Sequence, residues 1–206
     1  MKLLLIGPPA SGKGTIGERL SRQFSIPFIS VGALFRELPE GHPLKKRMDE
    51  IMESGELLPQ DIVAQVLREE VEKESSRSGF IFDGWGRKLE DLKYYDPGFE
   101  KVIYLIISPE TSIKRIAARI TCEKCEAVFN LISVPPKVSG ICDFCGGKLI
   151  KREDETEEAT RRRLEIFSAE TKETIDYFRE KGNLLEIDGE GSPDEVYAKV
   201  VKALGY

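Results

Sequence analysis

The chain has 206 residues, enough for one principal domain with a well-buried core. It carries 31 Lys and Arg against 36 Asp and Glu, a net charge of -5, so it lacks the overall basic character of a nucleic-acid-binding protein. No apolar stretch approaches the roughly 20 residues of a membrane helix, and the apolar run at the N-terminus is too short for a signal peptide. We therefore expect a cytoplasmic protein with no membrane partner and no nucleic-acid partner.

Short apolar runs alternate with helical patterns along the chain. Buried strands are predicted at residues 3–6, 27–29, 80–82, 102–107 and 184–187. Helical periodicity covers residues 14–24, 61–73, 111–119, 155–180 and 193–204. This alternation predicts a doubly wound α/β fold, whose parallel sheet binds ligands at the carboxyl ends of its strands. Residues 30–59 and 121–153 interrupt the alternation and are predicted to be inserts.

The first predicted strand and helix are joined by a glycine-rich loop with the pattern G-x-x-x-x-G-K, which ends at Lys13. In this context a phosphate-binding loop is favoured over a plain Gly/Pro turn, because its backbone N–H groups form a nest for a polyphosphate. Gly14 follows the lysine where a Mg²⁺-binding Ser or Thr is usual, so we expect Mg²⁺ to sit on nucleotide oxygens and water. The predicted ATP-binding residues of the loop are Gly7, Pro9, Ala10, Ser11, Gly12, Lys13, Gly14 and Thr15.

All four cysteines lie in the second insert, as two Cys-x-x-Cys pairs separated by sixteen residues: Cys122, Cys125, Cys142 and Cys145. This spacing is typical of a tetrahedral Cys₄ zinc site. Two disulfides, an iron centre or an empty thiol site are the alternatives, and a reducing compartment disfavours the disulfides. Four thiolates leave no open coordination position, so the ion is expected to be structural rather than catalytic.

The order of motifs resembles the adenylate kinases, a family of nucleoside monophosphate kinases, along essentially the whole chain. The matching segments are 7–15, 29–36, 55–59, 83–87, 115–119, 152–155 and 161–164. The resemblance implies a P-loop three-layer α/β/α fold with a core of 1–29, 60–120 and 154–206, a helical monophosphate-binding insert of 30–59 and a zinc lid of 121–153. It also implies the reaction ATP + AMP ⇌ 2 ADP in purine nucleotide homeostasis, with Mg²⁺, structural Zn²⁺ and a monomeric enzyme.

The resemblance also assigns roles to individual residues. The catalytic residues it implies are Lys13, Asp83, Arg87, Arg119, Arg152 and Arg163, with Asp83 orienting water on Mg²⁺. Outside the loop, the implied ATP-binding residues are Arg115, Arg119, Val128, Phe129 and Gly191, with Arg115 stacking on adenine. The implied AMP-binding residues are Val31, Arg36, Glu56, Leu57, Leu58, Gly84, Trp85, Gly86, Arg87, Asp91, Arg152 and Arg163. Without the resemblance, a core aromatic is the alternative interpretation of Trp85. Arg161 and Arg162 are expected to be solvated.

The monophosphate side departs from the family pattern. Val31 replaces Thr, Ala33 replaces Asp, Gly86 replaces Pro, and Asp91 replaces the Gln that faces adenine. An ionised Asp only accepts hydrogen bonds, whereas Gln both donates and accepts. We therefore expect weakened AMP selectivity, unless Asp91 points to solvent. The alternatives are a kinase that accepts CMP or GMP, a zinc-module NTPase that binds nucleic acid, and a non-catalytic nucleotide-binding scaffold.

Overall fold

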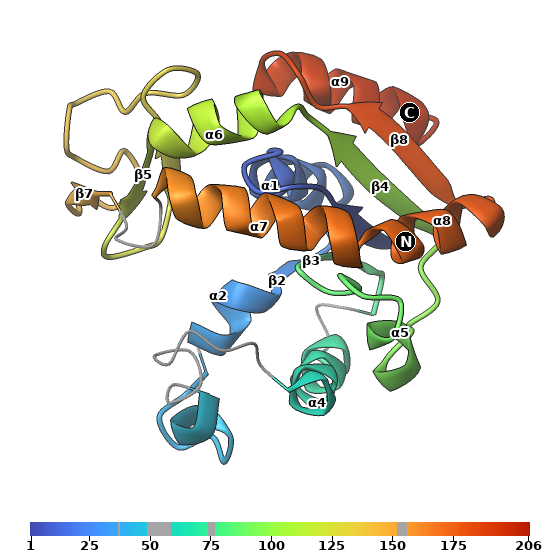
Figure 1. The fold of residues 1–206 in the computed structure, drawn as a ribbon. Coiled ribbons are helices and arrows are strands. Elements are labelled where there is room, and N and C mark those ends of the chain that lie inside the picture. The colour runs from blue at the N-terminus through green and yellow to red at the C-terminus, as the bar shows by residue number, and fades with distance from the viewer. Residues whose placement is uncertain (37, 49–58, 74–76, 152–155) are drawn as a thin grey trace. The chain divides into compact units, whose positions relative to one another are not determined.

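The computed structural model describes residues 1–36, 38–48, 59–73, 77–151 and 156–206, and for Arg36 it describes the backbone alone (Figure 1). These residues form two compact units. The first contains Met1–Ile6, Lys13–Tyr104 and Glu170–Glu186, and the second contains Gly7–Gly12, Leu105–Ala169 and Ile187–Tyr206. The chain passes from one unit to the other at both ends of the glycine-rich loop, within two strands, and near residue 170.

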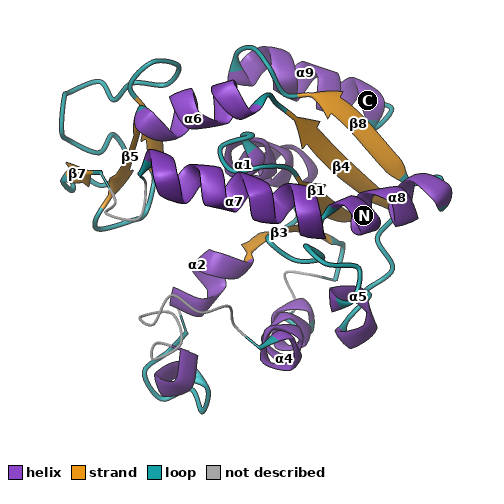
Figure 2. Ribbon diagram, viewed as in Figure 1, coloured by secondary structure: helices purple, strands orange, loops and turns teal. Residues whose placement is uncertain are grey.

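The central element is a five-stranded sheet with the order β2-β3-β1-β4-β8. Its strands are β1 (Lys2–Ile6), β2 (Phe28–Ser30), β3 (Phe80–Asp83), β4 (Lys101–Ile106) and β8 (Leu184–Asp188). The pairs β1–β3, β1–β4 and β2–β3 are parallel, and Figure 2 shows β8 running in the same direction as β4. Leu3, Leu4 and Leu5 of β1 are almost fully buried, because this strand is central and both of its faces are covered. The predicted α/β fold is confirmed.

The first unit adds helices to this sheet. They are α1 (Lys13–Phe24), α2 (Val31–Arg36), α4 (Gln60–Val71), α5 (Asp91–Tyr94) and α8 (Lys172–Glu180). Helix α1 buries Ile16 and Leu20 on one face, as its apolar spacing of four residues predicts. The aromatic rings of Phe82, Phe99 and Phe178 are in contact, so residues distant in the sequence share one core.

The second unit contains the helices α6 (Pro109–Ala117), α7 (Glu157–Glu170) and α9 (Pro193–Ala203). Ser108 caps α6 and Ser192 caps α9, and both helices have Pro in the first turn, where its fixed φ favours helix initiation. The unit also contains an antiparallel sheet of β6 (Val128–Asn130), β5 (Arg119–Cys122) and β7 (Leu149–Ile150), in that order. This small sheet lies within the predicted cysteine insert and its approach.

The structure differs from the sequence prediction at residues 155–180, where a single helix is expected. Two helices are present, α7 and α8, and buried Thr171 stands between them as the residue before α8. The polar spacing alone does not reveal this break, which coincides with the passage of the chain between its two units. In the described part of the chain, no helix is both long enough and apolar enough to cross a membrane.

Candidate functional site

The glycine-rich loop follows β1 and leads directly into α1. Ala10 has a φ of +57° and Gly12 a φ of +96°, so two of its residues adopt the left-handed conformation. The N–H of Ser11 donates to the carbonyl oxygen of Pro8 at 3.2 Å, and Ser11 is buried. Left-handed residues of this kind turn successive backbone N–H groups towards a common point, which produces an anion-binding nest. Lys13 is the first residue of α1, where the helix dipole adds a partial positive charge.

Arg115 of α6 joins this loop to the segment before α9. Its Nη1 donates to the carbonyl oxygen of Ala10 at 3.3 Å, and its Nη2 donates to the carbonyl oxygens of Gly189 at 2.9 Å and Gly191 at 3.1 Å. Two segments predicted to bind ATP, the loop and Gly191, are therefore held by the same guanidinium. Arg115 is itself a predicted ATP-binding residue, so these three predictions meet at one place in the second unit.

Two residues that the sequence analysis missed support this arrangement. Ser112, one helical turn before Arg115, donates its hydroxyl to the carbonyl oxygen of Pro9 at 2.7 Å. Glu190 accepts the N–H of Ser108 at 2.7 Å, and this hydrogen bond is the main cause of the lowered pKa of Glu190. The sequence holds no signal for either role, since an isolated Ser in a helix and an isolated Glu in a loop are common on any surface.

The first unit contains a second set of predicted residues, at the carboxyl end of β3. Asp83 is half-buried at the end of this strand and pairs in register with Ser30 of β2. A Cβ at Gly84 would lie 3.4 Å from the Cβ of Val31 and 3.7 Å from an Nη atom of Arg87. Three residues predicted for the monophosphate therefore lie together, with the side chain of Arg87 exposed to solvent.

Trp85, in the turn that follows β3, and Asp91, the first residue of α5, are both buried. The indole N–H of Trp85 donates to the carbonyl oxygen of Tyr95 at 2.9 Å, so its side chain is a core aromatic that is anchored at its polar end. Asp91 is only 2 % exposed, which shows that the alternative of a solvent-facing Asp91 is wrong. Its Oδ2 accepts the backbone N–H of Lys88 at 3.0 Å, and burial raises the pKa of this carboxyl. Its Oδ1 has no hydrogen-bond partner among the described residues.

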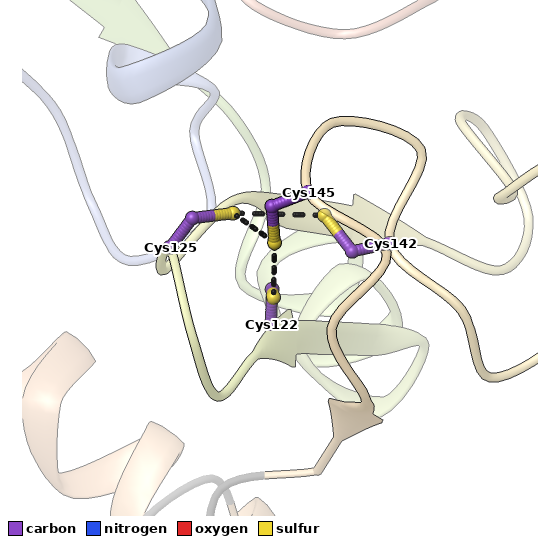
Figure 3. A group of neighbouring side chains, drawn as sticks. All are labelled: Cys122, Cys125, Cys142 and Cys145. Atoms are coloured by element: carbon purple, nitrogen blue, oxygen red, sulfur yellow. Dashed lines mark hydrogen bonds between the residues drawn. The ribbon is translucent and has the colours of Figure 1, made fainter.

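The four cysteines come together in one cluster, as Figure 3 shows. All four Sγ atoms lie within 4.8 Å of one another, and the distances are 3.2 Å for Cys125–Cys145, 3.5 Å for Cys122–Cys145 and 3.6 Å for Cys125–Cys142. A tetrahedral zinc ion with Zn–S bonds of about 2.3 Å separates its sulfur atoms by about 3.8 Å. The thiols are free, so they form a single four-sulfur group rather than two disulfides.

The backbone shapes this cluster through two matching turns. The N–H of Glu126 donates to the carbonyl oxygen of Cys122, and the N–H of Gly146 donates to that of Cys142, both at 3.0 Å. Glu126 and Gly146, the residues that follow the two Cys-x-x-Cys segments, both have a left-handed φ, of +56° and +69°. Gly147 packs directly against the sulfurs, because a Cβ there would lie 2.9 Å from the Sγ of Cys122.

The remaining predicted residues, in the lid and near it, differ in how exposed they are to solvent. Val128 is 58 % exposed, whereas Phe129 is buried against the cysteines and Leu149. Arg119 begins β5, and Arg163 lies exposed on α7. Arg161 pairs with Glu157 at 2.8 Å on the surface of the same helix, as expected for a solvated arginine. Five predictions lie wholly or partly outside the described residues: Glu56, Leu57, Leu58, Arg152 and the side chain of Arg36.

Comparison with known proteins gives a consistent result. A family profile described as "Adenylate kinase" matches residues 5–183. The adenylate kinase of Caldanaerobacter subterraneus subsp. tengcongensis is 38 % identical over 212 residues, which cover 99 % of this chain and 96 % of the relative. The adenylate kinases of Archaeoglobus fulgidus and Thermotoga maritima are also 38 % identical, over 97 % and 99 % of this chain and 96 % and 97 % of their own lengths.

Proposed function

The chain belongs to the adenylate kinase family, and from this premise we propose that it catalyses the reversible reaction ATP + AMP ⇌ 2 ADP. The observation that carries the proposal is the phosphate loop, with left-handed Ala10 and Gly12 followed by Lys13 at the start of α1. Such a loop binds a polyphosphate through backbone N–H groups and a lysine. Phosphoryl transfer suits it, because this reaction requires positioning and charge stabilisation rather than a covalent partner.

On the donor side, Lys13 binds the β- and γ-phosphates of ATP, and Arg115 stacks on adenine. The three carbonyl oxygens that accept from Arg115 fix the orientation of its guanidinium plane. Arg is suited to this role because it can donate hydrogen bonds from its edge while a planar face stacks on a ring. Gly191 belongs to the same part of the site, because its carbonyl oxygen is one of the three acceptors.

On the acceptor side, Arg36 and Arg87 bind the phosphate of AMP. The support for Arg87 is its exposed side chain beside Gly84 and Val31, at the carboxyl end of β3, where ligands bind in α/β sheets. Arg119, Arg152 and Arg163 supply further positive charge to the transferring group. Prearranged cations are effective here because charge on the equatorial oxygens must be stabilised in the transition state.

Mg²⁺ bound with ATP would supply positive charge that offsets the charge of the phosphates. The described residues fit such an ion, since Mg²⁺ keeps several waters and requires few direct protein ligands. Asp83 is a half-buried carboxylate at the strand end and orients these waters. Thr15 is an exposed residue and comes two residues after Lys13, so its hydroxyl is not assigned as a direct ligand.

We assign a structural Zn²⁺ to Cys122, Cys125, Cys142 and Cys145. The support is the single four-sulfur group with spacings near those of a tetrahedral zinc site. The four thiolates would hold the ion between the two Cys-x-x-Cys turns, and a shell of four sulfur ligands would leave no open position for substrate. Iron remains the competing ion for a Cys₄ group, and metal analysis of the purified protein by mass spectrometry distinguishes the two.

AMP is the proposed acceptor, although Asp91 replaces a glutamine in the family pattern. The buried Oδ2 of Asp91 accepts the N–H of Lys88, which gives this carboxylate a role within the turn. A broader acceptor range is the second candidate function, because Oδ1 of Asp91 lacks a partner among the described residues. The variant Asp91→Gln distinguishes the AMP-selective kinase from the kinase with a broader acceptor range. If the relative kcat/KM values for AMP, CMP and GMP are the same in this variant as in wild type, Asp91 does not recognise the base.

We further propose that residues 30–59 and 121–153 move as inserts on the core and exclude water, so that AMP rather than water accepts the phosphoryl group. By the likeness to the family, the enzyme is assigned as a cytoplasmic monomer. Light scattering after gel filtration tests the monomer, and a mass near twice 23.2 kDa would contradict it.

Two arginines of α7 provide a matched test of the proposed function. Arg163→Ala removes an assigned catalytic cation, whereas Arg161→Ala removes an exposed arginine that pairs with Glu157. In a coupled assay with Mg-ATP and AMP, we expect kcat to fall at least about 100-fold in Arg163→Ala and to change less than twofold in Arg161→Ala. Equal kcat values for the two variants would contradict the assignment of Arg163.

A further inference from the structure

The phosphate loop is held from one side by α6, through two hydrogen bonds to consecutive carbonyl groups. Ser112 donates its hydroxyl to the oxygen of Pro9 at 2.7 Å, and Arg115 donates to the oxygen of Ala10 at 3.3 Å. The two donors are three residues apart, so they project from the same face of the helix. All of these residues lie within the second compact unit.

Ser112 is an unusual residue to find at this place in a helix. Serine is a weak helix former, and a helical serine commonly returns its hydroxyl to a carbonyl of its own helix. Here the side chain is 0 % exposed, and the hydroxyl crosses to a residue 103 positions earlier in the sequence. Alanine has a higher helix propensity than serine. The hydrogen bond to Pro9 is therefore the physical reason for a hydroxyl at position 112.

This hydrogen bond sets the direction of one peptide group in the loop. Because a trans peptide is planar, its C=O and N–H point in opposite directions. With the oxygen of Pro9 held at α6, the N–H of Ala10 points away from α6. Ala10 also has a left-handed φ of +57°, which an L-residue with a side chain rarely adopts unless surrounding contacts maintain it. The hydrogen bonds on either side of Ala10 provide those contacts.

We propose that Ser112 is a positioning residue for the phosphate loop, which orients the loop's N–H groups towards the ATP phosphates through its hydrogen bond to Pro9. The proposal rests on the proposed function, because it takes the loop to be the ATP site. Ser112 acts only through the backbone of the loop and touches no substrate. Its loss therefore weakens ATP binding and leaves AMP binding, which is assigned to other residues, intact.

The test compares Ser112→Ala with Thr160→Val by titration calorimetry of Mg-ATP alone and of AMP alone. Thr160 is the matched control, since its buried hydroxyl donates at 2.8 Å to the carbonyl oxygen of Thr156, the residue just before its own helix. We expect Ser112→Ala to raise the Kd for Mg-ATP about tenfold, the equivalent of one hydrogen bond, and the Kd for AMP less than twofold. Thr160→Val changes both constants less than twofold.

Two results would overturn the proposal: a Kd for Mg-ATP within twofold of wild type in Ser112→Ala, or equal weakening of both nucleotides, which indicates a general structural role. If Ser112→Ala fails to fold, Ser112→Cys carries the same test, because it keeps a similar volume with a much weaker donor. Failure of wild-type protein to bind Mg-ATP would instead contradict the proposed function itself.

Discussion

Substituting two glycines of α1, Gly14 and Gly17, should have opposite effects on protein stability and on the reaction with ATP. A Cβ at Gly14 would meet no atom within 4 Å, whereas a Cβ at Gly17 would lie 2.2 Å from the ring of Phe28. Gly14→Ala should therefore stabilise the protein by about 0.4–1 kcal/mol, because alanine restricts the unfolded chain. Gly17→Ala gains the same amount, about 0.4–1 kcal/mol, but overpacks the contact with Phe28 at a cost of about 1–3 kcal/mol, so its net effect is a loss of up to about 2.6 kcal/mol.

The catalytic activity of the two variants should follow the opposite order to their stability, with Gly14→Ala the less active. Gly14 follows Lys13 in the phosphate loop, so we expect Gly14→Ala to lower kcat/KM for ATP at least about tenfold, because a Cβ crowds the bound phosphates. Gly17→Ala should keep kcat/KM for ATP within about twofold. Urea unfolding gives the stabilities and a coupled assay gives the rates. The reasoning is refuted if Gly14→Ala is less stable than wild type, or if it is more stable and fully active.

Three further predictions concern the acceptor side and the lid. Burial raises the pKa of Asp91, so the stability of wild type relative to Asp91→Asn should be greatest below the ordinary carboxyl pKa of 3.8. This stability difference should fall as pH rises through the folded-state pKa. Urea midpoints of both proteins from about pH 3 to 8 test this, and a constant difference would contradict it. Zinc chelation should abolish hydrogen-exchange protection of the Cys122 and Cys142 amides while β1 stays protected, and one-step unfolding of the whole chain would contradict a separable lid. Arg87→Ala should lower kcat at least about 100-fold in steady-state assays, and near-normal turnover would remove Arg87 from the site.

The sequence was most informative where a local pattern corresponds to one physical requirement. The phosphate loop and the cysteine spacing both belong to this class, and the structure confirms the strand–loop–helix context of the first and the four-sulfur cluster of the second. Both patterns are short and self-contained, so their meaning depends little on distant parts of the chain. The buried strands were equally accessible, because a central parallel strand such as β1 is a continuous apolar run.

Features that depend on tertiary contact were not predictable. Ser112 meets a carbonyl group 103 residues away, and no periodicity in α6 distinguishes it from an ordinary helical serine. The break at Thr171 lies within a polar pattern that continues through both helices. For Asp91, the residue type alone left both a base-facing and a solvent-facing side chain open, and its burial under the turn became evident only from the fold.

The most direct test of the central claim is a coupled assay with Mg-ATP and equal concentrations of AMP, CMP, UMP or GMP. An adenylate kinase with AMP as acceptor should show a kcat/KM for AMP at least about tenfold above that for each other nucleotide, and Lys13→Ala should abolish the rate with all four. A preference for CMP or GMP would contradict AMP as the acceptor. A rate with none of the four would contradict the proposed reaction.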